Sequence, residues 1–383
     1  LTKGRVGWNI VTSYLNSAAI NLGLDRQISH DERYAIAEEF VDVCYRLWEG
    51  SWEDDAVIRD VDNHVYIDPS KVHDINHEGK YFKVAGPHLC EPSPQRTPVI
   101  FQAGASSRGR VFAAKHAECV FISTPTKFIA KNYVDKLRNE LKEVGRDPQE
   151  VKVLCLFTPI VGKTQKEAEQ KYEEYKRLAS YEGALALFGG WTGIDLSDYD
   201  PEDELRFVKN DAIHSAVETF TKIDPNKKWT VKEVAEFASV GGIGPVAVGT
   251  PEKIADIMEE WVTEAGVDGF NIAYAITPGT FKEFVDDVIP ILQERGLVQK
   301  EYSSETLRGN LTNQSQLPLH HPAKKYYRSL PIRNKIFLTF ASGFVIFITI
   351  IATFIYWNNV NEMKNQTQSL SNVLSGQFVR TVD

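Results

Sequence analysis

Short and almost continuous apolar runs alternate with longer amphipathic stretches along residues 1–300. Apolar runs of this kind predict parallel strands buried on both faces, and the stretches between them predict helices. We therefore expect an α/β fold, either a (β/α)8 barrel or a doubly wound sheet. The expected strands are 5–12, 98–102, 119–123, 151–158 and 269–275, and the expected helices are 30–48, 110–116, 125–144, 163–181 and 280–295.

Two later stretches break this alternation. Residues 182–250 are rich in Gly, Asp and Trp and contain only short helical patterns. In a barrel, an insertion of this length usually forms a lid over the mouth at the carboxyl ends of the strands. Residues 301–330 are polar, contain Pro318 and Pro322 and have no sustained period. This composition predicts a linker.

The run 336–357, IFLTFASGFVIFITIIATFIYW, contains no charged residue. A helix of this length spans roughly 33 Å, which matches a bilayer core of about 30 Å. Basic residues are frequent before the run and scarce after it, which places its N-terminal side in the cytosol by the positive-inside rule. We expect residues 331–357 to form one transmembrane helix, the barrel to be cytosolic and residues 358–383 to be an extracytosolic juxtamembrane tail.

The net charge and the cysteine spacing argue against a nucleic-acid-binding protein, a metal site and a disulfide framework. The formal net charge of −9 and the absence of a basic stripe argue against nucleic-acid binding. The four cysteines, Cys44, Cys90, Cys119 and Cys155, are far apart and form no C-x-x-C pair. The sequence therefore predicts neither a metal site nor a disulfide framework, and it favours a reducing compartment.

The segment 99–115 carries the strongest chemical signal, because an apolar strand runs through a small-residue turn straight into a helix. Such a turn presents free backbone N–H groups, and the helix dipole adds partial positive charge, so the pattern favours an anion. Ser106 or Ser107 can cap the helix, and Arg108 or Arg110 can pair with a phosphate. An ordinary βα turn without a ligand remains the alternative.

Several longer motifs give the chain a family resemblance. It resembles the nitrilotriacetate monooxygenase and dibenzothiophene-sulfone monooxygenase branch of the bacterial-luciferase-like flavin monooxygenases over roughly residues 1–300. The motifs are GRVGWNIVTSY at 4–14, HDERY at 30–34, LWEGSW at 47–52, CEPSPQRTP at 90–98, FQAGASS at 101–107 and VGTPEKIA at 248–255.

The resemblance implies a (β/α)8 barrel that uses reduced FMN supplied by a separate flavin reductase. In such enzymes O2 and reduced flavin form a C4a-peroxide, which transfers one oxygen atom to a small organic substrate. A homo-oligomer is also implied. Position by position, Asn9 and Ser13 end the strand that faces the isoalloxazine, and Tyr34 approaches the flavin. His30 is a candidate catalytic residue, although capping and packing explain it too. The residues implied to hold the FMN phosphate are Gly104, Ala105, Ser106 and Ser107.

The chain also departs from this family pattern. About three further βα units are expected before the strand at Arg5, and residues 330–383 resemble the membrane-entry segment of a sensor protein. The alternative hypothesis is therefore a membrane-anchored, non-catalytic fragment, or an erroneous fusion of a broken monooxygenase with a sensor-protein N-terminus. A third interpretation keeps the barrel and replaces FMN by a deazaflavin.

Overall fold

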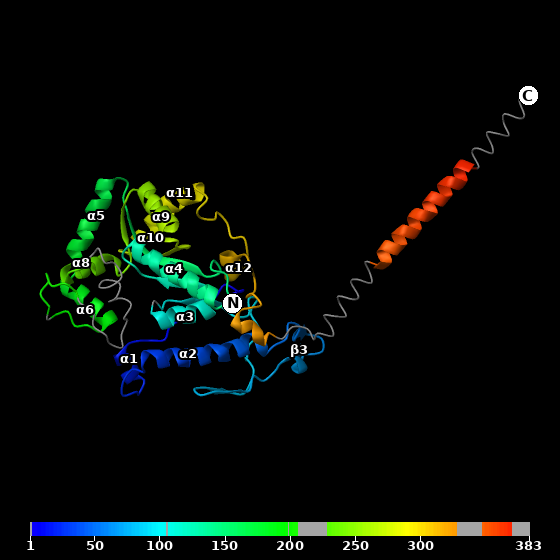
Figure 1. The fold of residues 1–383 in the computed structure, drawn as a ribbon, viewed down its shortest axis with the longest axis horizontal. Coiled ribbons are helices and arrows are strands. Elements are labelled where there is room, and N and C mark those ends of the chain that lie inside the picture. The colour runs from blue at the N-terminus through cyan, green and yellow to red at the C-terminus, as the bar shows by residue number, and fades with distance from the viewer. Residues whose placement is uncertain (1, 105, 198, 206–227, 328–346, 370–383) are drawn as a thin grey trace, which may run out of the picture. The chain divides into compact units, whose positions relative to one another are not determined.

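The computed structural model describes residues 2–104, 106–197, 199–205, 228–327 and 347–369 (Figure 1). The chain divides into two units. Unit 1 comprises Leu1–Trp52 and Asp68–Tyr327, and unit 2 comprises Glu53–Ile67 and Arg328–Asp383. All the sequence motifs named above except the apolar run near the C-terminus belong to unit 1.

A parallel sheet forms the centre of unit 1. Its strand order is β1-β6-β7-β8-β10, and β9 pairs with the second half of β8. All of these pairings are parallel, so the carboxyl ends of the strands lie along one edge. In the described residues β1 and β10 each pair with a single strand and form the two ends of the sheet. The strands are β1 (Gly7–Ile10), β6 (Val99–Gln102), β7 (Cys119–Ile122), β8 (Lys152–Val161), β9 (Val246–Gly249) and β10 (Gly269–Ile272).

Helices cover the outer face of this sheet, as the ribbon of unit 1 shows (Figure 1). Val120, Val153 and Phe157 point to this side and share one buried cluster with Leu137 of α4 and Trp261 of α9. The helices of unit 1 are α1 (Asn16–Asn21), α2 (His30–Tyr45), α3 (Ser107–His116), α4 (Lys127–Glu143), α5 (Gln165–Leu178), α6 (Tyr181–Thr192), α8 (Val231–Gly241), α9 (Pro251–Ala265), α10 (Gly279–Glu283), α11 (Ile289–Glu294) and α12 (Leu307–Thr312). Shorter elements are η1 (Arg46–Gly50), η2 (Pro69–Lys71), η3 (Phe284–Val288), η4 (Pro322–Tyr326) and the hairpin of β4 (His77–Glu78) with β5 (Lys83–Val84).

Threonine side chains define where several helices begin. Thr126, Thr164, Thr230 and Thr250 each accept a hydrogen bond from the backbone N–H three residues further on. These bonds satisfy donors that the first helical turn leaves without a partner. The Glu233 carboxylate in turn accepts a hydrogen bond from the backbone N–H of Thr230, which completes a capping box at α8.

The insertion after α5 has a small core of its own. Phe188 on α6 and Val234 on α8 are buried together with Leu196 and Trp229. Residues 206–227, in the middle of the expected lid 182–250, lie outside the described residues, and the role of a lid stays a prediction. The insertion ends earlier than expected, because residues 246–249 form strand β9 beside β8.

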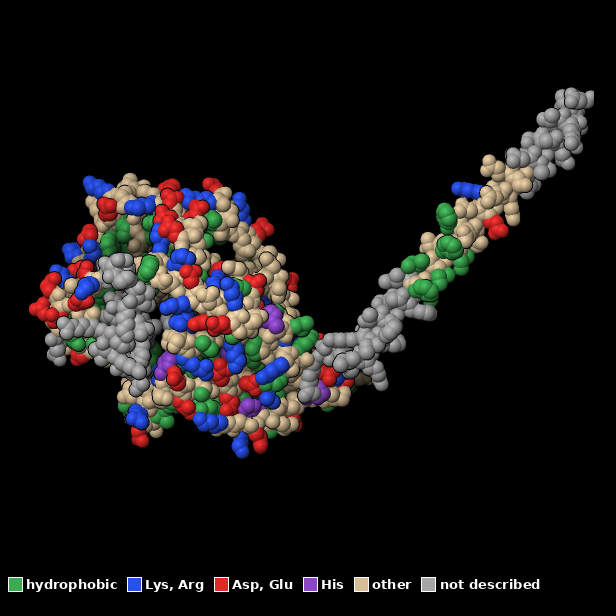
Figure 2. All heavy atoms as spheres, viewed as in Figure 1, with side chains coloured by type: hydrophobic (Ala, Val, Ile, Leu, Met, Phe, Trp, Pro, Cys, Tyr) green, Lys and Arg blue, Asp and Glu red, His purple; other side chains and the backbone are tan. Residues whose placement is uncertain are grey.

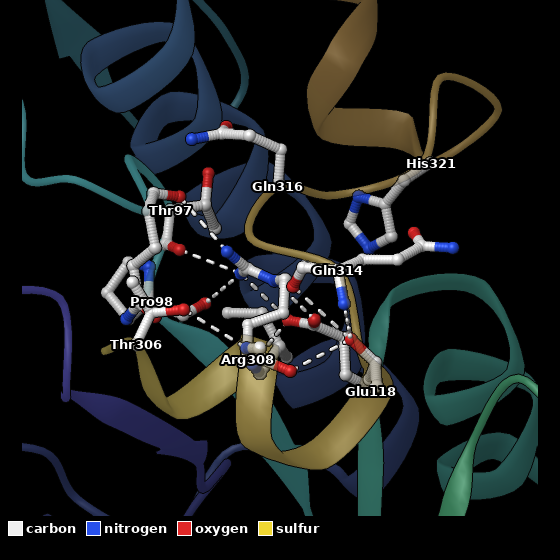
Figure 3. A network of polar contacts seen from close by, with 12 residues as sticks. Thr97, Pro98, Glu118, Thr306, Arg308, Gln314, Gln316 and His321 are labelled. Carbon is white, nitrogen blue, oxygen red and sulfur yellow. Dashed lines mark hydrogen bonds and ion pairs between the residues drawn. The ribbon is translucent and has the colours of Figure 1, made fainter. Parts of the chain in front are cut away.

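The segment 301–327 differs from the expected linker. We call residues 304–327 the strap; it contains α12 and η4, and it packs on the body of unit 1. Arg308 is only 1% exposed, and His321 and Lys324 are also buried. Figure 3 shows Arg308 directed at Glu118, Thr97 and Pro98. The polar side chains of the strap therefore serve as buried partners, which composition alone does not reveal. Residues 328–330 lie outside the described residues.

Unit 2 contains the hairpin of β2 (Val57–Asp60) with β3 (Val65–Ile67) and a helix over 347–369. In this helix the apolar run 347–357 is followed by Asn358, Asn359, Glu362 and Lys364. Among the helices that the structure describes, none is both long and apolar enough to cross a membrane. This finding corrects the expected single-pass membrane location and membrane partner. Residues 336–346 of the expected span and 370–383 of the expected tail lie outside the described residues.

Candidate active site

The inner face of the sheet, away from the helices, is apolar with amide groups near its ends. Asn9 lies beside Phe101 in the strand register, and Leu156 lies beside Asn271. The rings of Phe101 and Phe121 are stacked with centroids 5.1 Å apart. Neighbouring residues in a parallel register point to the same face, and alternate residues along a strand share it. The inner face therefore presents Gly7, Asn9, Phe101, Phe121, Leu154, Leu156, Gly269 and Asn271.

The turn between β6 and α3 lies at the carboxyl edge of this sheet and is shaped by two glycines. A Cβ on Gly104 would lie 2.5 Å from the hydroxyl of Tyr34, and a Cβ on Gly109 would lie 2.7 Å from the same atom. Gln102 accepts the backbone N–H of Gly104 at 2.6 Å, and Tyr133 donates to the Gly104 carbonyl at 3.3 Å. Only glycine fits at both positions, so the turn is held in one compact shape.

Ser106 connects the turn to the start of α2. Its Oγ caps α3 by accepting the Gly109 N–H at 3.1 Å. The same oxygen lies 3.2 Å from Nε2 of His30, whose Nδ1 lies 2.9 Å from Asp31 Oδ1. The His30 ring packs on Tyr34 with centroids 5.1 Å apart. The N-termini of two helices, α2 and α3, therefore meet at one serine–histidine contact.

Charged side chains surround this contact. Arg108 lies over the Tyr34 ring at 5.9 Å, with its guanidinium 3.9 Å from Glu38. Burial acts to raise the pKa of Glu38, but hydrogen bonds from His116 and Lys115 outweigh it and lower that pKa to about 2. Glu38 is therefore ionised at neutral pH and balances the cations around it. The Arg108 side chain is 34% exposed, so an anion can approach it from solvent.

The structure places the predicted residues in two groups at the same sheet edge. Asn9 is on the inner face, and Ser13 follows β1 with a φ of +58°. Because β1 pairs with β6, the ends of these strands adjoin the turn that carries Gly104, Ser106 and the exposed Ser107. Ala105 lies outside the described residues.

Tyr34 and His30 lie on the side of the turn that faces α2. Tyr34 belongs to the buried cluster between the sheet and α2, and its hydroxyl supports the turn from the helix side. His30 touches Ser106. The sequence reasoning missed Gln102, Gly109 and Tyr133. The spacing of Gly104 and Gly109 was the available signal, since two glycines on either side of the turn permit its close packing.

Comparison with known proteins identifies the family of this chain. The luciferase-like monooxygenase family matches residues 1–269, and the chain belongs to this family. It is 52% identical to the dimethyl-sulfide monooxygenase of Hyphomicrobium sulfonivorans over 85% of this chain and 68% of that protein. It is 48% identical to the long-chain alkane monooxygenase of Geobacillus thermodenitrificans over 85% and 70%.

A solved structure adds a ligand to the comparison. The crystal structure of the riboflavin lyase RcaE, with modified FMN and riboflavin, is 38% identical and superposes with a TM-score of 0.78, over 85% of this chain and 72% of that one. These matches confirm the expectation of a flavin-dependent monooxygenase and give no support to a non-catalytic fragment or fusion.

Figure 2 shows acidic and basic side chains interspersed over the visible face of unit 1.

Proposed function

We propose that unit 1 binds reduced FMN with its phosphate at the β6–α3 turn and its ring over the inner face of the sheet. The contact between Ser106, His30 and the N-terminus of α3 carries this proposal, because it gathers hydrogen-bonding groups and positive potential at one point. The Gly104 and Gly109 N–H groups are taken by Gln102 and Ser106, so the phosphate is proposed to meet the start of α3, where the helix dipole adds positive potential. Ser106, Ser107 and Arg108 would hold the phosphate.

The remaining residues orient the ring and exclude water. The stacked rings of Phe101 and Phe121 make this face apolar, and the amide of Asn9 on the same face is proposed to hydrogen-bond to a polar edge of the ring. When bound, reduced flavin activates O2 for insertion of one oxygen atom into a small organic substrate. The insertion with α6 and α8 is proposed to shield this reaction from water. A separate flavin reductase is the proposed source of reduced FMN, and a homo-oligomer stays a prediction.

The strands β1, β6, β7, β8 and β10 are proposed to be an arc of a (β/α)8 barrel. Each is parallel to its neighbour and follows it in chain order, with helices on the outer face. This arrangement is the one that a barrel repeats until it closes.

Titration of the chain with FMN, followed by quenching of flavin fluorescence, tests the cofactor proposal. The double variant Ser106→Asp with Ser107→Asp should lose FMN binding, because two carboxylates would face a phosphate dianion. Ser303→Asp is the matched control, because Ser303 is exposed in the segment that leads into the strap. Equal FMN affinity in the double variant, or binding of a deazaflavin in place of FMN, would contradict the proposal.

A further inference from the structure

The hydroxyl proton of Ser106 is already used in a hydrogen bond to His30. A serine hydroxyl has one O–H donor and two acceptor lone pairs. The Gly109 N–H occupies one lone pair at 3.1 Å. The carboxylate of Asp31 can only accept, so the Nδ1 of His30, at 2.9 Å, carries the ring proton. Nε2 of a neutral His30 is then an acceptor, and the Ser106 hydroxyl donates to it across 3.2 Å.

This arrangement is unfavourable for an incoming phosphate. Phosphate oxygens only accept when the group is a dianion, so Ser106 must turn its proton toward them. Nε2 of His30 and Ser106 Oγ would then face each other as two acceptors. A proton on Nε2 removes the conflict, because His30 then donates to the second lone pair of Ser106.

We propose that His30 takes up one proton from solvent when a phosphate monoester binds at the β6–α3 turn, and that this proton frees the Ser106 hydroxyl for the phosphate. The inference rests on the proposed function and identifies His30 as a positioning residue. One N–H bond forms on Nε2 and no other covalent bond changes. The histidine thereby links recognition of the phosphate to proton uptake.

The charged and polar groups around His30 come from two helices. Asp31 Oδ1 lies at its Nδ1, Ser106 at the N-terminus of α3 lies at its Nε2, and Glu38 is paired with Lys115 and His116. A dianion bound at the β6–α3 turn would add negative charge beside this ring, which favours the second N–H of the imidazole.

Calorimetric titration of the full chain with FMN measures this proton directly. At about pH 8 the ligand phosphate, whose second pKa is about 6, is already a dianion, so a proton taken from the buffer reports on the protein. Titrations in two buffers of different ionisation enthalpy should give uptake approaching one proton per FMN. The dissociation constant should rise by up to about tenfold per pH unit above neutrality, as expected for one linked proton.

Two variants and one ligand separate the possible causes. His30→Gln should bind FMN more weakly, without proton uptake and with an unchanged thermal unfolding midpoint. His320→Gln should behave as the wild type, because His320 is exposed and pairs with Glu150. Riboflavin lacks the phosphate and should bind without proton uptake.

Each failure has a distinct meaning. FMN binding without proton uptake in the wild-type chain would overturn the role of His30 and leave the proposed function standing. Equal proton uptake with riboflavin, or in His30→Gln, would also overturn that role. A wild-type chain that binds no FMN at all would instead contradict the proposed function.

Discussion

Replacing Arg308 by methionine should severely destabilise unit 1. Its guanidinium is buried and donates to both carboxylate oxygens of Glu118, at 2.6 and 3.0 Å. It also donates to the carbonyls of Gln95, Thr97 and Pro98 at 3.0, 2.8 and 3.3 Å (Figure 3). Methionine fills similar space but leaves the Glu118 charge and three carbonyls without this partner.

The expected loss follows from the burial of both partners. Breaking a buried ion pair by removing one side costs about 3–5 kcal/mol, because the remaining charge stays out of water. Such a loss is a large part of the roughly 5–15 kcal/mol that stabilises an ordinary domain. Urea unfolding followed by far-UV circular dichroism measures it as a lower midpoint at an unchanged slope.

Two controls test the electrostatic explanation. Arg26 is exposed, and Arg26→Met should change stability by no more than about 0.5 kcal/mol. Adding Glu118→Gln to Arg308→Met should recover part of the loss, because the buried charge is gone while the amide oxygen of the introduced glutamine can still accept the Ile100 N–H. A loss below about 1 kcal/mol in Arg308→Met would refute the reasoning, since that is the range of exposed ion pairs.

Three further predictions concern the glycine turn, the stability at acidic pH and the strap. Gly109→Ala should cost about 1–3 kcal/mol in urea unfolding, because its Cβ would meet Tyr34 and the Gly104 backbone; Gly190→Ala, in open space on α6, should cost nothing. The pKa of Glu38 falls from 4.5 to about 2 on folding, so its stabilisation, on the order of 2 kcal/mol, is present above about pH 4.5 and lost as the pH falls toward 2. Thermal melts of Glu38→Gln should therefore show a shallower decline over that range, and an identical decline would exclude Glu38 as its source. Lys324→Met should cost about 3–5 kcal/mol, because it leaves the fully buried Glu49 unpaired, and a denaturation midpoint equal to the wild type would contradict this.

The sequence predicted the elements that have a clear local pattern of apolar residues. The runs at 98–102, 119–123 and 151–158 are strands β6, β7 and β8, because each is apolar on both faces of a covered parallel sheet. The amphipathic pattern at 125–144 likewise corresponds to α4. The turn between β6 and α3 was also predicted, because its small residues stand between an apolar run and a helical pattern.

The elements that were missed depend on contacts between distant residues. Arg308 and Glu118 are 190 positions apart, and no local period relates them. The strap was interpreted as a linker because its polar residues give no apolar pattern, although those residues are its means of attachment. Tyr34 shares a buried cluster with Ile100 and Phe112, and its approach to the flavin stays a prediction. Such placements follow from tertiary packing and not from the order of residue types.

Strand β6 links the strap to the candidate flavin site. At its start, Arg308 binds the carbonyls of Thr97 and Pro98, and Glu118 accepts the N–H of Ile100 at 3.0 Å. At its other end, the same strand leads into the glycine turn at Gly104. The backbone of β6 is also paired with β1 on one side and with β7 on the other. The strap therefore contacts this strand at the end opposite the glycine turn, so a change in the strap can reach the turn only through the sheet.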